Sequence, residues 1–301
     1  MGHLRSIACK VFLGYLRRFP WRDGKALMYQ RLNRALAPDR GWVVARLNRG
    51  FTLRLDLADP VQRRLFFFGD YDERREADLI NRVLAPGEVF WDVGANLGYF
   101  TLLAAARLQN TGQVVAFEAS RRTFACLQAN VALNPFRNIV LCPAAVADQA
   151  GDAVLFRTRG SADGRANLFQ PAADQTETET VRTITLDGWR RREGAAAPDF
   201  IKLDVEGAEP AALRGARETL ASGGPLLLVE MKEAICRALG TERTAIQEYL
   251  GPWGYRPAGL VKGRWRLFED VGSIVSRNVL WLIPDSPRHR RKAHQAGVRG
   301  I

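Results

Sequence analysis

The chain has 301 residues, of which 47% are hydrophobic, and its formal net charge is +12. This size allows one or two domains with a full buried core, and no apolar run approaches the roughly eighteen residues of a transmembrane helix. The N-terminus shows no secretory signal pattern, so a cytoplasmic location is expected. The four cysteines have no paired or metal-ligand spacing, which favours reduced, mostly buried thiols.

The positive charge is concentrated at the two ends of the chain. Residues 1–50 hold eleven Lys or Arg against two Asp, and residues 284–301 hold five against one. The stretch between them is therefore close to neutral. This distribution argues against a basic nucleic-acid groove across the body, although terminal arms could still bind polyanions.

Residues 1–40 predict an N-terminal helical extension. Between Leu4 and Phe19, apolar residues recur at steps of three and four, and the basic residues lie mainly on the opposite side. Such a basic amphipathic helix could dock on the body, pack in a dimer or make peripheral contact with an anionic membrane surface. A second helix is expected over Lys25–Leu36. The pattern does not indicate an oligomeric state.

Residues 41–86 lead into the main domain. Trp42–Leu57 alternates between apolar and polar residues, which predicts two strands joined by a turn at residues 48–50. A helix is expected over Glu76–Leu84, where Pro86 and Gly87 close it.

The following stretch organises the rest of the chain. Val89–Trp91 predicts a short buried strand that ends on Asp92. Gly94 and Gly98 bracket a tight turn, and Phe100–Leu108 then predicts a helix. A strand, glycine turn and helix in this order present unpaired backbone N–H groups that suit a carboxylate or phosphate. Asp92 adds a charge at the strand end, where open α/β sheets bind ligands.

The next strand indicates the kind of ligand. Gln113–Phe117 is apolar and ends on Glu118, where an acid can accept hydrogen bonds from both ribose hydroxyls. The dinucleotide fingerprint G-x-G-x-x-G is absent, because Asn96 and Tyr99 occupy two of its glycine positions. What remains resembles the first two motifs of class I S-adenosylmethionine-dependent methyltransferases. An NAD-type oxidoreductase, another nucleotide binder or a purely structural βα unit are the alternatives.

The middle of the chain continues the alternation. The expected elements are a helix over Arg122–Leu133, a strand over Ile139–Val146 followed by Asp148, an extra strand over Ala153–Arg157, an extended segment over Val181–Leu186 and a short helix over Asp187–Arg192. Ser161–Thr180 is polar and predicts a long loop, either functional or disordered. In that loop Asp163, Arg165 and Asn167 could contact a hydroxyl-rich acceptor, and Leu168-Phe169 could pack against a sugar face.

The last third completes the predicted fold. Its expected elements are a strand over Phe200–Leu203, a helix over Pro210–Ala221, a strand over Leu226–Val229 that ends on Glu230, a helix over Thr244–Leu250, and an antiparallel pair of Arg264–Phe268 with Val279–Ile283. The whole pattern predicts an α/β fold: a three-layer, Rossmann-like, mostly parallel sheet with a C-terminal antiparallel hairpin. Residues 87–284 are the expected main domain, and residues 285–301 a basic tail.

A second group of acids follows the strand Phe200–Leu203. Asp204 and Glu206 should border the ligand crevice, whereas Glu209 is explained by the dipole of the helix that follows. The three histidines lie in the charged ends, so a general base would be a carboxylate or Lys202. An acid-rich edge suits O-methylation, because a carboxylate can take the proton of an alcohol acceptor. The Asn/Asp-Pro-Pro-aromatic motif of base-amine methyltransferases is absent here, so no specific nucleic-acid partner is expected.

Several segments together resemble the FkbM-type methyltransferase family. They are Asp92-Val-Gly-Ala-Asn-Leu-Gly-Tyr99, Ala116-Phe-Glu118, Thr185-Leu-Asp187, Ile201-Lys-Leu-Asp-Val-Glu-Gly-Ala-Glu209 and Leu213-Arg-Gly-Ala216. Two positions depart from the family's pattern: Ala119-Ser120 follows Glu118 where a proline is usual, and Tyr71-Asp72-Glu73 replaces Tyr-Glu.

The resemblance implies S-adenosylmethionine as cofactor and O-methylation of a small-molecule or glycan hydroxyl. The expected catalytic residues are Asp204 and Glu206, and the expected cofactor contacts are Asp92, Gly94, Ala95, Asn96, Gly98, Glu118, Ala119 and Asp148. No metal is expected, although Asp204, Glu206 and Glu230 could together hold Mg²⁺. A non-catalytic scaffold that binds membranes or polyanions through its ends is the remaining alternative.

Overall fold

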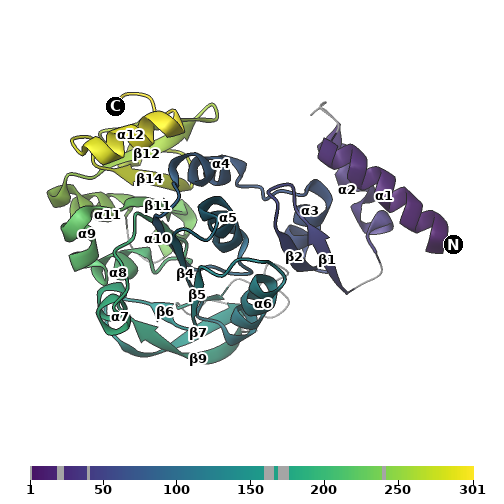
Figure 1. Cartoon of the computed structure of the whole chain (residues 1–301), viewed down its shortest axis with the longest axis horizontal. Coiled ribbons are helices and arrows are strands. Elements are labelled where there is room, and N and C mark those ends of the chain that lie inside the picture. Colours follow the sequence, from purple (N-terminus) through teal and green to yellow (C-terminus); the bar gives the residue numbers. More distant parts are fainter. Residues whose placement is uncertain (1, 19–23, 39–40, 159–165, 169–175, 239–241) are drawn as a thin grey trace.

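The computed structural model describes residues 2–18, 24–38, 41–158, 166–168, 176–238 and 242–301, and Figure 1 shows their arrangement. The main domain is built around an eight-stranded sheet with the order β13-β12-β14-β11-β10-β3-β4-β5. Five of these strands are parallel: β3 (Val89–Val93), β4 (Gln113–Phe117), β5 (Ile139–Cys142), β10 (Phe200–Leu203) and β11 (Leu226–Glu230). The predicted α/β class with a mostly parallel sheet is confirmed.

The order of the strands in the main sheet indicates where a ligand crevice is expected. From β3 the chain proceeds to β4 and β5 on one side, and it later returns to β10 and β11 on the other side. The topology therefore reverses between β3 and β10, and open α/β sheets bind ligands outside the carboxyl ends of strands at such a point.

Helices cover both faces of the sheet, because successive strand residues point to opposite faces. Phe90 packs into a core with α4 (Arg74–Val83), α5 (Tyr99–Leu108) and α12 (Pro287–Ala296). Trp91 packs into a second core on the other face. The helices that contribute to this second core are α7 (Leu186–Glu193), α8 (Glu209–Arg214), α9 (Arg217–Gly223) and α11 (Arg243–Leu250). α6 (Arg121–Ala132) packs Val131 against the first core and places Leu127 in a smaller third cluster. α10 (Glu233–Ala238) follows β11.

The antiparallel edge differs from the expected pairing. β14 (Asn278–Leu282) pairs with β11 on one side and with β12 (Arg256–Val261) on the other, and β12 then pairs with β13 (Arg264–Leu267). The predicted direct pairing of Arg264–Phe268 with Val279–Ile283 is therefore wrong. The hairpin joins β12 and β13 through a turn at Lys262 and Gly263, and both have positive φ there.

A second, four-stranded sheet contains β6 (Ala145–Val146), β9 (Thr176–Ile184), β7 (Gly151–Thr158) and β8 (Ala166–Asn167), in that order. The predicted single strand over Ile139–Val146 is wrong, because β5 stays in the main sheet and β6 pairs with β9. The predicted loop is also too long, since Thr176–Thr180 belong to β9 and pair with β7. Its Asp163, Arg165 and Phe169 lie outside the described residues.

The N-terminal extension docks on the body beside the main domain (Figure 1). It contains α1 (Gly2–Arg18), α2 (Lys25–Leu36), the antiparallel pair β1 (Trp42–Arg46) and β2 (Thr52–Asp56), and α3 (Pro60–Phe68). The ring of Phe12 in α1 lies 5.3 Å from that of Phe67 in α3. In the part of the chain that the structure describes, no helix has the length and hydropathy to span a bilayer.

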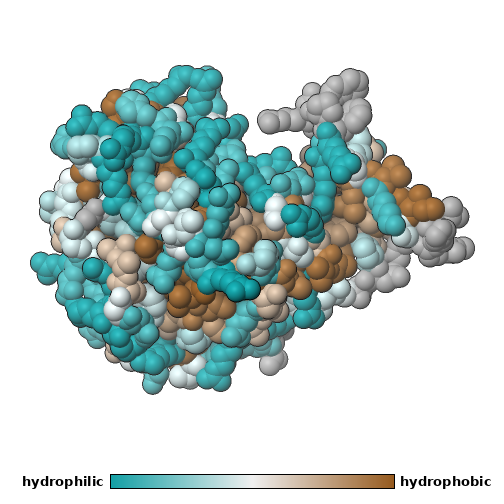
Figure 2. Space-filling view, in the orientation of Figure 1, coloured by the Kyte–Doolittle hydropathy of each residue, from teal (hydrophilic) through white to brown (hydrophobic). Residues whose placement is uncertain are grey.

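Docking leaves part of the apolar surface of the extension uncovered. Hydrophobic residues gather over the region of α1 and α2 in Figure 2. The large hydrophobic side chains that stay exposed on these two helices are Ile7, Val11, Leu27, Met28 and Leu32. Peripheral membrane contact through the first helix stays a prediction.

The C-terminal segment is folded, whereas a basic tail was expected. Its helix α12 packs on α4, and the side chain of Lys292 donates to the carbonyl of Val83 at 2.8 Å. His289 is buried and hydrogen-bonds to Gly224 and Ile283 through its two ring nitrogens. Burial lowers the pKa of His289 to about 4. The expectation that no histidine lies in the core is therefore wrong, although His289 does not line the cavity described below.

Asp187 has a structural role in this fold. Its carboxylate accepts hydrogen bonds from the backbone N–H groups of Glu218 and Thr219 at 2.7 and 2.9 Å, and from the Thr219 hydroxyl at 2.7 Å. These donors belong to the first turn of α9, so Asp187 links α7 to the N-terminus of that helix.

We expect Asp187→Ala to lower the free energy of unfolding by about 2–3 kcal/mol, because three donors lose a charged acceptor in a buried position. Urea denaturation measures the change. The matched control is Asp148→Ala, which removes a half-exposed carboxylate paired with Arg214 and should cost less than about 1 kcal/mol. Equal losses in the two variants would contradict this role for Asp187.

Candidate active site

A cavity opens at the carboxyl ends of β3, β4, β10 and β11, at the point where the sheet topology reverses. Residues that end or directly follow these strands line it, including Gly94, Glu118, Asp204 and Glu230. One end of the cavity is apolar, and Ala119, Ala145, Leu155 and Leu168 form that wall. The other end carries most of the charged side chains. The geometry thus offers a site for a ligand with one apolar and one polar half.

The glycine turn after β3 is shaped by a close backbone approach. Gly94 has φ of 81°, and a Cβ at this position would lie 1.9 Å from the carbonyl oxygen of Asp204. Only glycine fits here, because both the space and the backbone conformation exclude a side chain. The turn therefore lets the ends of β3 and β10 meet.

The N–H groups of this turn are not free, contrary to the expectation. Gly94 and Ala95 both donate to the carbonyl of Phe117, at 3.0 and 2.9 Å, and Gly98 donates to Ala95 at 2.9 Å. Asn96 donates to the Glu118 carboxylate at 2.9 Å. The turn therefore shapes the cavity wall more than it supplies donors to a ligand.

Glu118 lines the cavity, and two backbone N–H groups hold its carboxylate in place. One carboxylate oxygen accepts from the N–H of Asn96, and the other accepts from the N–H of Ser120 at 3.0 Å. Burial raises the pKa of Glu118 to about 7, although these two hydrogen bonds favour its charged form. A proline directly after this acid would stand at Ala119 and would leave the N–H of Ser120 in place, so this departure from the usual pattern does not affect that hydrogen bond.

Lys202 lies beneath the polar end of the cavity. Its side chain is 4% exposed, and its ammonium lies 3.2 Å from the Asp204 carboxylate and 4.8 Å from the centre of the Phe100 ring. Burial opposes its charge, but the carboxylates of Asp204 and Asp92 raise the pKa of Lys202 above its usual value. Lys202 therefore stays protonated and is unsuited to act as the general base.

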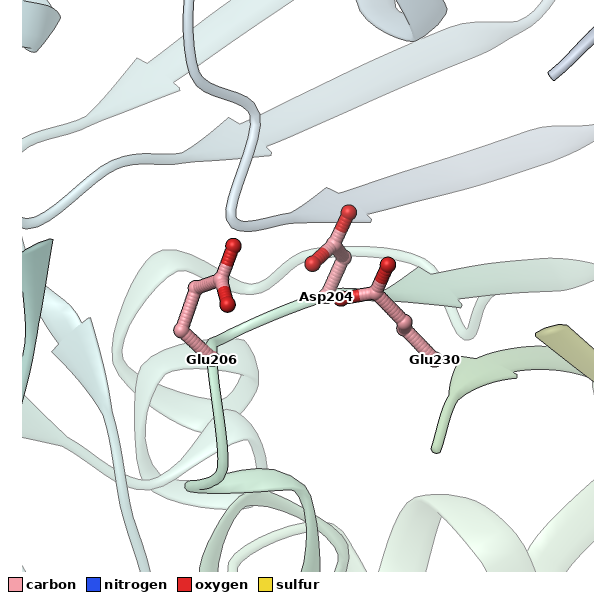
Figure 3. A group of neighbouring side chains, drawn as sticks. All are labelled: Asp204, Glu206 and Glu230. Atoms are coloured by element: carbon pink, nitrogen blue, oxygen red, sulfur yellow. The ribbon is translucent and has the colours of Figure 1, made fainter. Parts of the chain in front are cut away.

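Glu206 and Glu230 flank Asp204, and all three carboxylates point into one space (Figure 3). The ammonium of Lys232 lies 2.7 Å from Glu206 and 2.6 Å from Glu230, so it bridges the two acids. Arg277, which immediately precedes β14, lies 3.7 Å from the other oxygen of Glu230 and forms an ion pair with Glu73. The polar end is thus a network of alternating charges.

The two central carboxyl groups titrate differently. Burial alone would raise the pKa of Asp204, but the Lys202 ammonium and a hydrogen bond with Glu230 hold it below its ordinary value. Burial, followed by the charge of Asp204, raises the pKa of Glu230. The pair therefore consists of one acid that stays ionised and one that gains a proton readily.

The expected site residues fall into two groups. Those that line the cavity are Gly94, Ala95, Asn96, Glu118, Ala119, Asp204 and Glu206. Asp92, Gly98 and Asp148 do not line it. Asp92 is buried behind the turn, where one oxygen accepts from Thr101 at 2.6 Å, and Asp148 pairs with Arg214 at 2.9 Å. Glu209 accepts from the N–H groups of Val205 and Gly207, so its role is local, as expected.

Other cavity residues were not predicted as site residues. The sequence pattern predicts Glu230 only as a strand end and a metal ligand, and it does not single out Lys232. The strand-end rule that identified Asp204 could have found both, because Glu230 ends the next parallel strand and Lys232 lies two residues after it. Arg277 and Glu73 lie outside that rule. They precede β14 and α4, and only the folded chain brings them to the cavity.

The three carboxylates Asp204, Glu206 and Glu230 have the composition of a cation site, with oxygen atoms within 4.8 Å of one another. In this structure the ammonium groups of Lys202 and Lys232 neutralise them. A divalent cation would have to displace Lys232, so the arrangement favours internal ion pairs. The absence of an obligatory metal stays a prediction.

Comparison with known proteins identifies a family. The family model described as "Methyltransferase FkbM domain" matches residues 92–257, which is more than half of the chain. The 2-O-methyltransferase NoeI of Sinorhizobium fredii is 26% identical over 57% of this chain and 77% of its own. The 31-O-demethyl-FK506 methyltransferase FkbM of Streptomyces tacrolimicus is 31% identical over 45% and 62%, respectively. The hexuronic acid methyltransferase AglP of Haloferax volcanii is 28% identical over 50% and 60%.

A solved structure is also similar. It is the methyltransferase FkbM from Methylobacillus flagellatus, 18% identical, with a TM-score of 0.42 over 65% of this chain and 43% of the other. The chain spans about three fifths of two of the three relatives above.

We expect Lys202→Met to lower the free energy of unfolding by about 3–5 kcal/mol, because it leaves buried carboxylates without a counter-charge. The double variant Lys202→Met/Asp204→Asn removes one of those carboxylates and should recover part of the loss. Urea denaturation of the two variants and the parent measures this coupling. A double variant that is less stable than Lys202→Met alone would show that the ion pair does not govern the site.

Proposed function

The chain belongs to the FkbM methyltransferase family, and from this premise we propose that it transfers the methyl group of S-adenosylmethionine to a hydroxyl of a sugar or a related natural product. The names of the relatives describe O-methylation and a hexuronic acid substrate, which supports this acceptor class. The observation that carries the proposal is the single cavity that joins Glu118 to the Asp204–Glu230 pair. The oxidoreductase and scaffold alternatives are set aside, because the family is one of methyltransferases.

We place the cofactor by the polarity of the cavity. Glu118 would accept hydrogen bonds from the ribose hydroxyls, as carboxylates after the second strand do in nucleotide-binding sheets. The adenine would lie against the apolar wall that includes Ala119 and Leu168. The backbone of Gly94, Ala95 and Asn96 would border the cofactor's path toward the charged end. Asp92 and Gly98 would act indirectly, by holding the turn in shape.

We propose that the proton of the acceptor hydroxyl passes to Glu230 in its ionised form, which predominates above its raised pKa of about 8. The acceptor oxygen attacks the methyl carbon, the carbon–sulfur bond breaks, and its electron pair stays on sulfur as S-adenosylhomocysteine leaves. Asp204 stays ionised beside Glu230 and makes it the more basic of the two groups. Glu206 holds Lys232 against Glu230. Most of the rate would come from positioning the acceptor in line with the sulfonium, with proton transfer adding the rest.

The first test concerns Glu118. Glu118→Ala should weaken S-adenosylmethionine binding by about 1.5–3 kcal/mol, roughly ten- to a hundredfold, because a charge-assisted hydrogen bond is lost. The carboxylate must be ionised to accept from the ribose, and its pKa in the free protein is about 7. Affinity should therefore decrease below that pH, by about tenfold per unit at most.

Calorimetry from pH 5.5 to 8.5 measures this dependence. Glu118→Gln is the matched control, since it keeps the shape of the side chain and should bind weakly at every pH in that range. If the Glu118→Ala protein is folded and keeps the parent affinity for S-adenosylmethionine, then the ribose does not bind to Glu118.

The second test concerns the base. Glu230→Gln should lower kcat by about 100- to 1000-fold while S-adenosylmethionine affinity stays within about threefold, because only proton transfer is lost. Glu206→Gln is the matched control: it touches the same lysine but should lose less than about tenfold. The assay follows labelled methyl transfer to a responsive glycan fraction, with EDTA present.

Two results would contradict this assignment. A larger loss in Glu206→Gln than in Glu230→Gln would make Glu206 the base. Activity that vanishes with EDTA and returns with Mg²⁺ would show that the three acids hold a metal.

A further inference from the structure

A groove rich in arginine lies away from the cavity described above. It consists of two adjoining hollows between α4, the β12–β13 hairpin and the C-terminal segment, and both hollows are lined by Arg264, Trp265 and Arg299. We call it the basic groove. Its cationic side chains are Arg75, Arg82, Lys262, Arg264, Arg266 and Arg299, and all of them are exposed.

The fold holds these cations in place. The N–H of Arg299 donates to the carbonyl of Trp265, and the carbonyl of Arg299 accepts from Leu267, both at 2.9 Å. The last residues of the chain are therefore fixed beside β13. Arg75 reaches the hairpin turn, where its guanidinium would lie 3.0 Å from a Cβ on Gly263. Three segments distant in sequence thus place positive charge on one hollow.

Little negative charge compensates these cations. Within the described ranges, none of the six forms an ion pair with a carboxylate, whereas Arg256 on the adjacent strand pairs with Glu269. Asp78 also lines the groove, but it pairs with Arg49 at 2.8 Å. Like charges held close together repel one another, and a bound anion relieves that repulsion.

We propose that the basic groove binds an anionic ligand that carries two or more phosphate groups. The planar fork of a guanidinium matches two phosphate oxygens at once, and several forks around one hollow suit clustered phosphates better than a single carboxylate. This site is separate from the methyl-transfer cavity, because none of the six cations lines that cavity. Glu73, which directly precedes α4, lines the cavity, whereas Arg75 and Arg82 within α4 line the groove.

Calorimetry with inorganic pyrophosphate tests the proposal on the full chain. Arg264→Ala and Arg299→Ala should each weaken binding by about tenfold or more, because each removes a charged, bidentate contact. Arg256→Ala is the matched control, since it removes the same charge from the adjacent strand and should change binding by less than about twofold. Binding by the parent should also weaken as NaCl is raised.

A second arm distinguishes a soluble diphosphate from the clustered phosphate groups of several phospholipid headgroups on a membrane surface. Sedimentation with phosphatidylcholine vesicles, with and without phosphatidic acid, is measured in the presence and absence of pyrophosphate. Sedimentation that requires phosphatidic acid would assign the groove to lipid phosphates, if pyrophosphate reverses it and Arg264→Ala weakens it. Pyrophosphate binding without sedimentation would assign it to a soluble ligand.

Three outcomes would overturn the proposal. In the first, the protein neither binds pyrophosphate nor sediments with vesicles that contain phosphatidic acid. In the second, Arg256→Ala weakens binding as much as the groove variants do. In the third, the protein binds no pyrophosphate, and pyrophosphate does not displace it from the vesicles. S-adenosylmethionine binding by each variant serves as the fold control and should stay within about twofold of the parent. This control distinguishes a failure of the anion-binding proposal from a failure of the methyltransferase assignment.

Discussion

The buried ion pair between Lys202 and Asp204 is the interaction on which the site depends. Burying an isolated charge is costly, so the sheet can end in carboxylates only if a cation lies beneath them. Lys202 meets this requirement from within β10, at the register position opposite Asp92 on β3. It keeps Asp204 ionised, and the charge of Asp204 in turn raises the pKa of Glu230. One buried lysine thus shifts the pKa values of two adjacent acids in opposite directions.

The Asp204-Val-Glu-Gly-Ala-Glu209 segment shows how one motif combines structural and chemical roles. Glu209 folds back on the N–H groups of Val205 and Gly207, and this contact fixes the turn after β10. Glu206 has positive φ and directs its carboxylate toward Lys232. The carbonyl of Asp204 lies so close to Gly94 that no other residue fits there. The motif therefore sets the distance between the cofactor turn and the acid cluster, so its spacing is more informative than any one of its acids.

The parts of the fold that follow local rules could be predicted from the sequence. Short apolar runs that end in an acid predict β3, β4, β10 and β11. They therefore also predict that Glu118 and Asp204 lie at the ends of two of these strands. The antiparallel edge could not be predicted, because β14 inserts between β11 and β12 through contacts distant in sequence. α12 was read as a tail because it is strongly basic, yet it buries His289 and Lys292 through hydrogen bonds to backbone carbonyls. The positive charge of this segment alone therefore predicts a tail wrongly, because specific hydrogen-bond partners allow its basic residues to be buried.

The positive charge of the chain is used in two different ways. Around the cavity each cation faces a carboxylate: Lys202 faces Asp204, Lys232 faces Glu206 and Glu230, and Arg277 faces Glu73. Those cations tune acids and cannot attract a second anion without releasing the first. In the basic groove the cations lack such partners within the described residues, so their field extends into solvent. The two regions therefore differ in kind: the cations around the cavity are paired with carboxylates, and those of the basic groove face solvent.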